Sequence, residues 1–323
     1  MTALLERLGV ELPIVQAGMG GGLARAELAA AVSEAGGLGT LGLMPPQVLA
    51  SELAKARRAT QKPIALNLLL NLARAKHWEV AREADIVVTF WGRPKRRTEK
   101  PWLHQCGSVD EARAARAAGA DGVIVQGVEA GGHVRGTTPA LELLRAVREA
   151  LPDGYPLLVA GGIADSADVR RALDAGAEAA VLGTRFLMSE ESGARKAYKQ
   201  RLMESRETVL TELFGLGWPD APHRVIWNEA TERWLANDRR GPRWVRTANR
   251  ITAPVLSRLP ESLQAAALGR QSANVPFLSG QPPADTAPST LLDSGALHAG
   301  ETVARIHDIR PAKELVRELA GVG

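Results

Sequence analysis

A histidine in a glycine-rich loop is the residue of this chain that is best placed to do chemistry. Residues 122–125 form an apolar run that ends on the polar Gln126, and the loop that follows, residues 127–136, carries several glycines and His133. An apolar run with this ending is typical of a strand in a buried parallel sheet, and ligands bind beyond the carboxyl ends of such strands. Because an imidazole with an ordinary pKa of about 6.5 exchanges protons near neutral pH, His133 is the candidate catalytic base.

Two glycine turns predict a phosphate site in the same region. The turn 161–163 follows the apolar run 155–160, and the turn 183–184 follows the run 179–182. In barrels of alternating strands and helices, backbone N–H groups after strands seven and eight commonly bind a phosphate, together with a helix N-terminus. The alternative is that these are tight strand-to-helix turns only, in which glycine is routine.

Neutral polar side chains stand at the ends of four apolar runs. They are Asn67, Thr89, Gln105 and Gln126. Amide groups at strand ends can donate and accept hydrogen bonds along the edge of a heterocycle. No lysine or carboxylate stands at these ends, which disfavours a Schiff-base aldolase and a divalent-metal enolase, since both need such groups there. For Asn67 and Gln126 the alternative is an internal hydrogen bond that closes the end of the barrel.

The other histidines, the single cysteine and the tryptophans point less clearly to a site. No histidine pair has the spacing of a metal site, and a lone Cys106 excludes an internal disulfide and a cysteine-rich metal site. His104 lies within an expected strand and is interpreted as a packed histidine. Four tryptophans close together in sequence are interpreted as core of a second segment rather than as a substrate cage; they are Trp218, Trp227, Trp234 and Trp244.

Eight apolar runs separated by helical patterns predict the elements that position these residues. The expected strands cover residues 13–17, 38–42, 63–67, 85–90, 102–106, 121–126, 155–160 and 179–183. Ser108, Thr138 and Asp165 are the expected N-caps of three helices. The alternation predicts the α/β class and a (β/α)₈ barrel, in which the polar connection 92–101 takes the place of one helix. An open doubly wound sheet ranks second, because no Gly-x-Gly-x-x-Gly follows the first strand.

The character of the sequence changes after Ser189. We expect residues 1–189 to form the barrel, residues 190–300 to form a mostly helical insertion, and residues 301–323 to complete the barrel. Within the insertion, the spacing of apolar residues predicts a helix over 196–214.

The bulk composition is that of a soluble globular protein. The chain has 323 residues, of which 45% are hydrophobic and 24% are charged. A net charge of +4, spread along the chain, is compatible with an anionic ligand and does not indicate nucleic acid. Neither a leader segment nor a run of about 18 apolar residues is visible, so we expect a cytoplasmic protein with no membrane partner. The oligomeric state stays open, with a homodimer among the expectations.

Several of these motifs together resemble those of the nitronate monooxygenases, formerly called 2-nitropropane dioxygenases. The matching stretches are residues 13–19, 35–39, 126–133, 160–163 and 182–186, together with Asn67 at the end of its strand. The resemblance covers most of residues 10–190, and residues 300–316 look like the family's closing segment. It implies an FMN-dependent barrel enzyme that oxidises alkyl nitronates, which are small anions, with O₂ to carbonyl compounds and nitrite.

The resemblance also implies roles for individual residues. His133 matches the family's active-site histidine, which would deprotonate a neutral nitroalkane or hydrogen-bond an incoming nitronate. Gly162, Gly183 and Thr184 would hold the FMN phosphate, in agreement with the turns described above. With the strand-end residues added, the expected FMN-binding set is Ala17, Gly18, Met19, Asn67, Gln105, Gln126, Gly131, Gly132, Gly161, Gly162, Val181, Leu182, Gly183 and Thr184. No metal ligand is expected.

Three other functions stay open. The same barrel resembles the flavin-dependent enoyl-acyl-carrier-protein reductases, which reduce a double bond with a nicotinamide. A flavin-free isomerase or lyase of a phosphorylated metabolite would keep the barrel and its phosphate site. A non-enzymatic flavin-binding protein would use the tryptophan-rich region, residues 215–245, to dock a partner.

Overall fold

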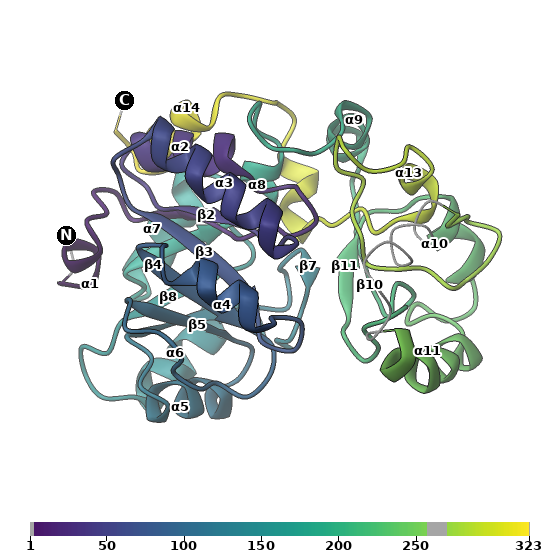
Figure 1. Cartoon of the computed structure of the whole chain (residues 1–323), viewed down its shortest axis with the longest axis horizontal. Helices are drawn as coiled ribbons and strands as arrows, with labels where there is room; N and C mark the ends of the chain where they lie inside the picture. Colours follow the sequence, from purple (N-terminus) through teal and green to yellow (C-terminus); the bar gives the residue numbers. More distant parts are fainter. Residues whose placement is uncertain (1–2, 257–269, 323) are drawn as a thin grey trace. The chain divides into compact units, whose positions relative to one another are not determined.

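Eight parallel strands form the central sheet of the first of two compact units (Figure 1). They are β1 (Ile14–Gln16), β2 (Gly39–Leu41), β3 (Ile64–Leu69), β4 (Ile86–Phe90), β5 (Trp102–Cys106), β6 (Gly122–Gln126), β8 (Leu157–Ala160) and β9 (Ala179–Leu182). Their order is β1-β9-β8-β6-β5-β4-β3-β2, and a parallel bridge between Val15 and Leu38 joins the two edges of the sheet. The sheet therefore closes on itself, which confirms the predicted (β/α)₈ barrel.

The computed structural model describes residues 3–256 and 270–322. The first unit comprises residues 1–129, 135–193 and 308–323, and the second comprises residues 130–134 and 194–307. The part of the predicted insertion that covers residues 257–269 lies outside the described residues. None of the described helices is long and apolar enough to cross a membrane.

Helices follow most strands of the barrel. In chain order they are α2 (Ala26–Glu34), α3 (Pro46–Ala59), α4 (Ala75–Ala81), α5 (Val109–Ala117), α6 (Ala140–Ala150), α7 (Ser166–Asp174), the short α8 (Thr184–Leu187) and α14 (Ala312–Leu319). The connection from β4 to β5, residues 91–101, is described throughout and holds no helix, as its polar sequence predicts. The N-terminal helix α1 (Ala3–Leu8) packs Leu4, Leu5 and Leu8 into the cluster inside the barrel.

The strands are mostly apolar because both of their faces are buried. In β6, Val123 and Val125 belong to the cluster shared with the helices, whereas Ile124 joins the cluster inside the barrel. A strand covered on both faces needs apolar side chains at successive positions, which explains the continuous apolar runs in the sequence.

Gln126 is the last residue of β6, and Thr89 and Gln105 come one residue before the ends of β4 and β5. The prediction that a strand ends at Asn67 is wrong, because β3 continues to Leu69.

Side-chain caps fix the starts of three barrel helices. Ser108 and Asp165 cap α5 and α7 through their side-chain oxygens, as predicted. The prediction that Thr138 caps α6 is wrong, because the N–H of Ala140 donates instead to both carboxylate oxygens of Glu129, at 3.0 and 3.1 Å. A carboxylate is the stronger acceptor at the positive end of a helix, so the acid of the glycine-rich loop displaces the hydroxyl from this role.

The second unit contains a three-stranded antiparallel sheet. Its strands, in sheet order, are β10 (Val209–Thr211), β11 (His223–Val225) and β7 (Gly132–His133). The helices of this unit are α9 (Lys196–Glu204), α10 (Glu229–Trp234), α11 (Arg243–Leu256), α13 (Leu291–Ser294) and the 3₁₀ helix η1 (Glu301–Arg305). Both residues of β7 come from the glycine-rich loop after β6, so the candidate base belongs to this sheet.

The helix predicted over 196–214 is wrong in its second half. α9 ends at Glu204, Ser205 is extended, and residues 209–211 form β10. The β-branched residues of this stretch suit a sheet, and β11 supplies their partner from a segment further along the chain. Because local spacing does not reveal a distant partner, the apolar periodicity favoured a helix.

The four clustered tryptophans take different places in the second unit. Trp227 and Trp234 pack against its apolar core, as predicted. Trp244 on α11 is 56% exposed. Trp218 stacks on the ring of His133, so it contributes to the candidate site rather than to the core.

Candidate functional site

Asn67, in β3, makes a hydrogen bond to the loop that follows β1. Its side-chain N–H₂ group donates to the carbonyl of Gly18 at 3.4 Å, and only 8% of Asn67 is exposed. A Cβ at Gly18 would overlap the side chain of Asn67, so this position of the loop accommodates only glycine. The structure thus brings together two of the residues predicted to bind FMN.

The loop after β1 also lies close to the end of β2. A Cβ at Gly42 would overlap the carbonyl of Met19, and the same carbonyl accepts the N–H of Ala24 at 3.0 Å. The fully buried Gln16 accepts the N–H of Thr40 at 2.9 Å through its side-chain oxygen. Sequence patterns did not single out Gln16, although an amide at the end of an apolar run was the same signal that identified Gln126.

The side-chain oxygen of Gln126, at the end of β6, makes a hydrogen bond within the protein. Its Oε1 accepts the N–H of Arg135 at 3.0 Å, which fixes the return of the glycine-rich loop. This is the internal hydrogen bond that the sequence offered as the alternative to a ligand contact, so a contact with FMN would have to come from the N–H₂ group. Gln105 lies on the neighbouring strand, partly exposed and in register with Ile124.

The turns after β8 and β9 leave space where side chains would otherwise lie. Gly162 has φ of +73°, and its Cβ position has nothing nearer than Glu129 at 3.9 Å. The Cβ position of Gly183 has nothing nearer than Ala17 at 3.9 Å. These distances are ordinary van der Waals contacts, so neither turn is crowded, and the backbone N–H groups of glycine turns on paired strands suit a phosphate group.

A buried carboxylate stiffens the turn after β8. Asp168 is 3% exposed, accepts the N–H of Ala164 at 2.8 Å and pairs with Arg171. Gly161 precedes this turn with φ of +108°, so it too adopts a conformation that other residues avoid. The remaining predicted contacts on β9 and after it are buried; they are Val181, Leu182 and Thr184.

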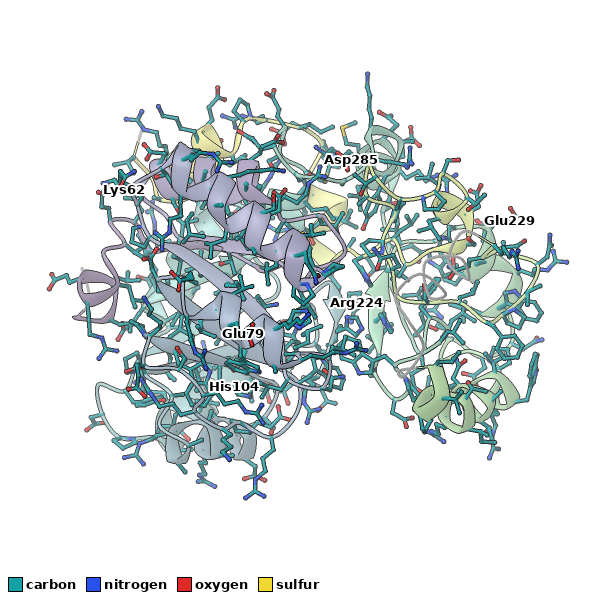
Figure 2. All side chains as sticks on the ribbon, in the orientation of Figure 1. Lys62, Glu79, His104, Arg224, Glu229 and Asp285 are labelled. Carbon is teal, nitrogen blue, oxygen red and sulfur yellow. The ribbon has the colours of Figure 1, made fainter. Side chains whose placement is uncertain are left out.

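The polar residues of β4 and β5 pack with one another. Oγ1 of Thr89 accepts the indole N–H of Trp102 at 2.7 Å and lies 2.7 Å from Nδ1 of His104, which is labelled in Figure 2. Burial lowers the pKa of His104 to about 4, so its ring is neutral at pH 7. Burial raises the pKa of the Cys106 thiol, which keeps the thiol protonated and unreactive. His104 is thus a packed histidine, as its position within a strand predicts.

Three histidines and a tryptophan lie together in the second unit. The antiparallel register of β7 and β11 places His133 opposite His223. The ring centroids of His133 and His223 are 4.1 Å apart, and those of His133 and His298 are 5.9 Å apart. Trp218 stacks on His133 with 3.9 Å between centroids and 21° between planes. We call these four residues the imidazole cluster.

Only one member of the imidazole cluster was predicted as a site residue. His223 and His298 carry no motif, and both reach His133 through pairings between segments far apart in the chain. No local pattern could have identified them, because the antiparallel pairing of β7 with β11 is itself invisible in the sequence.

Burial dominates the electrostatics of the imidazole cluster. It lowers the pKa of His133 and of His223 well below the ordinary value, and neighbouring imidazoles lower both further. Burial lowers the pKa of His298 to about 4, although the hydrogen bond to the carbonyl of Gly280 opposes this change. The three rings are therefore neutral at pH 7, and a neutral His133 is the form that can accept a proton.

Gly131 and Gly132 allow the chain at β7 to pack closely within the second unit. A Cβ at Gly131 would overlap the backbone of Ala299 and Gly300, and Gly132 has φ of +72°. Both residues were predicted to contact FMN, and the structure gives each an internal reason to be glycine. Within residues 3–256 and 270–322, no group of three or more His, Cys, Asp or Glu side chains is arranged to hold a metal ion.

Known proteins resemble this chain in sequence and in fold. It matches the family described as nitronate monooxygenase over residues 1–94 and 95–321. A Mycobacterium tuberculosis protein named (3aS,4S,5R,7aS)-5-hydroxy-7a-methyl-1-oxo-octahydro-1H-indene-4-carboxyl-CoA dehydrogenase is 34% identical over 253 residues, which cover 74% of this chain and 69% of the relative.

Two solved structures share the fold over nearly all of the chain. FabK from Thermotoga maritima has a TM-score of 0.78 at 26% identity, covering 100% of this chain and 96% of that one. Nitroalkane oxidase from Streptomyces ansochromogenes has a TM-score of 0.76 at 29% identity, covering 99% and 97%. With a family match that extends along almost its entire length, this chain belongs to the nitronate monooxygenase family of flavin-dependent oxidoreductases.

Proposed function

We propose that this protein is an FMN-dependent enzyme that oxidises alkyl nitronates with O₂ to a carbonyl compound and nitrite. The observation that carries the proposal is the pair of glycine turns that follow two paired strands of the barrel, where the nearest atoms to a Cβ at Gly162 or Gly183 would be 3.9 Å away. Such turns offer N–H donors to a phosphate, and the amide of Asn67 adds hydrogen-bonding capacity within β3, two residues before that strand ends. Membership of the family supports the same chemistry in general terms.

Each part of the proposed flavin site has its own residues. Gly162, Gly183 and Thr184 would hold the phosphate, and Asn67 and Gln126 would hydrogen-bond the edge of the flavin ring. FMN, when bound, would supply the transfer of electrons from the nitronate to O₂. The protein would bind and orient the small anion, and its mild positive charge of +4 favours the approach of such a substrate.

His133 would act as a base toward nitroalkanes and as a hydrogen-bonding group toward nitronates. Its ring is neutral because burial and the neighbouring imidazoles lower its pKa. With a neutral nitroalkane, a ring nitrogen would take the proton from the carbon beside the nitro group, and the electron pair would stay on the substrate as the nitronate. With a preformed nitronate no proton has to leave carbon. His133 should therefore matter far more for nitroalkanes than for nitronates.

An absorbance spectrum followed by anaerobic mixing tests the proposal. We expect the purified protein to show flavin absorbance that bleaches with propionate 3-nitronate and stays unchanged with NADH alone. After air is admitted, nitrite should appear in proportion to the nitronate consumed. Bleaching by NADH and not by the nitronate would contradict the proposal and favour a nicotinamide-dependent reductase.

A second candidate function is the oxidation or reduction of a coenzyme A thioester. It is favoured by the relative from Mycobacterium tuberculosis, whose name ends in carboxyl-CoA dehydrogenase and which is 34% identical to this chain. The same anaerobic experiment separates the two, with a hydroxyacyl-CoA in place of the nitronate. Bleaching by the thioester and not by the nitronate would select the second candidate.

A further inference from the structure

The backbone of the second unit assembles the imidazole cluster. The pairing of β7 with β11 brings His133 to His223, and an antiparallel bridge between Val225 and His298 adds the third imidazole. The phenol of Tyr198 on α9 donates to the carbonyl of His298 at 2.6 Å. Main-chain pairing thus brings the three imidazoles together from separate segments of the chain.

The hydrogen bond of His298 fixes its tautomer. Nε2 lies 3.0 Å from the carbonyl oxygen of Gly280, and since a carbonyl oxygen only accepts, Nε2 carries the hydrogen. Nδ1 of the neutral ring is then unprotonated, and no partner for it exists among the described residues. A Cβ at Gly280 would lie 2.8 Å from Nε2 of His223, so this glycine leaves room for both rings.

Packing alone does not account for three imidazoles in this place. His223 is fully buried, and within the described part of the chain neither of its ring nitrogens makes a hydrogen bond of ordinary geometry. Buried polar atoms without hydrogen bonds cost free energy, whereas leucine or phenylalanine would fill the same volume without that cost. Residues that reduce stability and that packing does not require are typical of a functional site.

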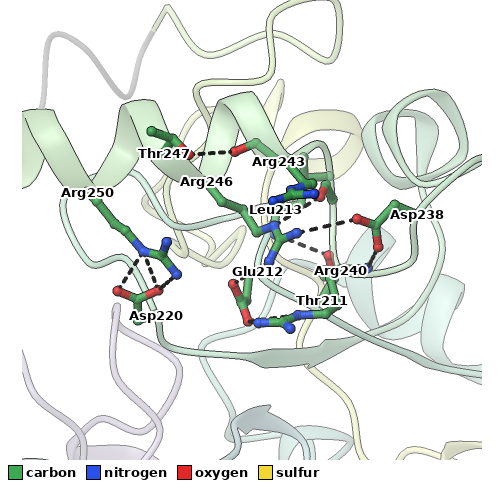
Figure 3. Close-up of polar contacts among 11 residues, drawn as sticks. Thr211, Glu212, Leu213, Asp220, Asp238, Arg240, Arg243, Arg246, Thr247 and Arg250 are labelled. Carbon is green, nitrogen blue, oxygen red and sulfur yellow. Dashed lines mark hydrogen bonds and ion pairs between the residues drawn. The ribbon is translucent and has the colours of Figure 1, made fainter.

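The charged residues near the cluster are paired with one another. The pairs are Arg224–Glu301, Glu212–Arg240, Glu212–Arg246 and Asp220–Arg250, and the last three are drawn in Figure 3. The backbone of Thr211 favours a protonated His223, and the carbonyl of Gly280 does the same for His298. After burial, the imidazoles of His223 and His298 lower the pKa of His133, and the imidazole of His298 lowers that of His223. The proton affinity of His133 and of His223 therefore depends on neighbouring rings as well as on burial.

We propose that His223 and His298 are positioning residues that keep His133 neutral until it takes the substrate proton, with the cluster holding one proton at a time. This inference rests on the proposed role of His133 as a base. Two protonated rings with centroids 4.1 Å apart would repel each other strongly in a buried site, so a proton on His223 excludes one on His133. Trp218 acts in the opposite direction, because its face stabilises a cation stacked on it.

The test compares the pH dependence of nitroethane oxidation in the parent flavoprotein with that of three variants. His223→Phe and His298→Gln each remove one ring that can take up the proton in acid. His133 should therefore become protonated at a higher pH than in the parent. The acid limb of kcat/KM should move up by about 1 pH unit, which is about tenfold less activity at a fixed acidic pH. In Trp218→Leu the limb should move down. A general loss of packing would not produce opposite shifts.

Two further readouts separate this inference from the proposed function. NMR titration of the His133 imidazole in the resting flavoprotein should show the same shifts without any substrate. Oxidation of preformed propionate 3-nitronate should show no shift of the acid limb, because no proton is abstracted from carbon. If the parent does not oxidise nitroethane, the proposed function fails, while the titration still decides whether the rings are coupled.

An exposed histidine of the same unit provides the matched control. His307→Gln should leave both the profile and the titration of His133 unchanged, because its ring is exposed and outside the cluster. If His223→Phe and His298→Gln both give a profile and a titration curve that overlay those of the parent, the inference is overturned.

Discussion

His133 lies between two rings with opposite effects on its charge. The face of Trp218 favours a cation, whereas the neighbouring imidazole of His223 disfavours one. Burial strengthens both effects, because charges and dipoles interact more strongly where water is excluded. The histidine of the glycine-rich loop thus has aromatic neighbours whose effects on its charge oppose each other.

Replacing His133 by asparagine should remove the base and leave the flavin. We expect kcat/KM for nitroethane to fall by about 10²-fold or more, since removing a general base usually costs at least this much. Turnover of propionate 3-nitronate should fall far less, and the flavin content should stay unchanged. Oxygen consumption with each substrate measures the effect. A variant that oxidises nitroethane as fast as the parent would show that His133 is not the base.

The site residues that the sequence revealed share one property. Gln126 directly follows an apolar run, His133 lies in the glycine-rich loop after the same run, and Gly162 lies in the turn after another, so these positions can be recognised without knowledge of their neighbours. His223 and His298 stand in segments whose pairing with β7 is not encoded locally, so their contact with His133 could not be predicted. The same limit explains why an internal hydrogen bond of Gln126 could be offered as an alternative while its partner, the N–H of Arg135, could not be named.

The turn after β8 is an element whose glycine can be tested for ligand contact. At φ of +73°, valine at position 162 would be strained by about 1–2 kcal/mol, and its side chain would crowd the turn, where a Cβ already comes within 3.9 Å of Glu129. We expect Gly162→Val to lower the affinity for FMN at least about tenfold, which is about 1.4 kcal/mol. Flavin retained after gel filtration and the dissociation constant from fluorescence titration measure this.

Gly154 offers a control with the same backbone conformation. It also has φ of +73° and has nothing within 4 Å of its Cβ position, but it precedes β8 rather than following it. Gly154→Val should therefore carry a similar strain and keep its flavin. Equal flavin occupancy in the two variants would refute the phosphate role of the turn after β8.

Helix α11 is connected to the rest of the second unit by a nearly buried carboxylate. Glu212 has 8% of its side chain exposed and pairs with Arg240 and Arg246 (Figure 3). Glu212→Gln should destabilise the second unit by about 1–3 kcal/mol, because two guanidinium groups lose a charged acceptor. Urea unfolding followed by tryptophan fluorescence would measure the loss.

The exposed pair of Asp220 with Arg250 is the natural comparison for Glu212. Their side chains are 55% and 51% exposed. Asp220→Asn should cost less than about 1 kcal/mol, as solvent screens exposed pairs. If the two substitutions cost the same, burial of Glu212 does not contribute to the stability of α11.

Elements covered on both faces were the ones that the sequence predicted well. The barrel strands are apolar at successive positions because helices and the barrel interior cover them, so their number and order along the chain could be predicted. The strands of the second unit are short and depend on partners from other segments, and β10 was predicted as helix. The start of α6 was predicted wrongly for a related reason, since its cap comes from Glu129 in a loop.

For the molecule as a whole, buried neutral histidines should make the fold sensitive to acid. Burial lowers the pKa of His104 in the barrel and of His298 in the second unit from 6.5 to about 4. In the unfolded chain both rings would titrate near 6.5, so below that pH the unfolded state binds protons that the folded state does not. The stabilisation is present above about pH 6.5 and is lost as pH falls toward 4, by about 2 kcal/mol per histidine between pH 6.5 and 5.

Urea unfolding at pH 7.5 and at pH 5 tests this expectation. The free energy of unfolding should be smaller at pH 5 in the parent, and the difference should shrink in His104→Gln, which removes one of the buried histidines whose pKa is lowered. An exposed-histidine variant, His307→Gln, should keep the full difference. Equal stability of the parent at both pH values would contradict the depressed pKa values of the buried rings.

The two residues of β7 belong to the second unit, although residues 1–129 before them and residues 135–193 after them belong to the first. Gly132 and His133 are encoded beside the barrel strand β6, yet they complete a sheet whose other strands lie within residues 194–307. A chimaera that exchanges residues 194–307 with those of a relative would replace His223, His298 and Trp218 while leaving the glycine turns of the barrel untouched. Such a chimaera would keep the turns proposed to bind the flavin while it changes the rings around His133.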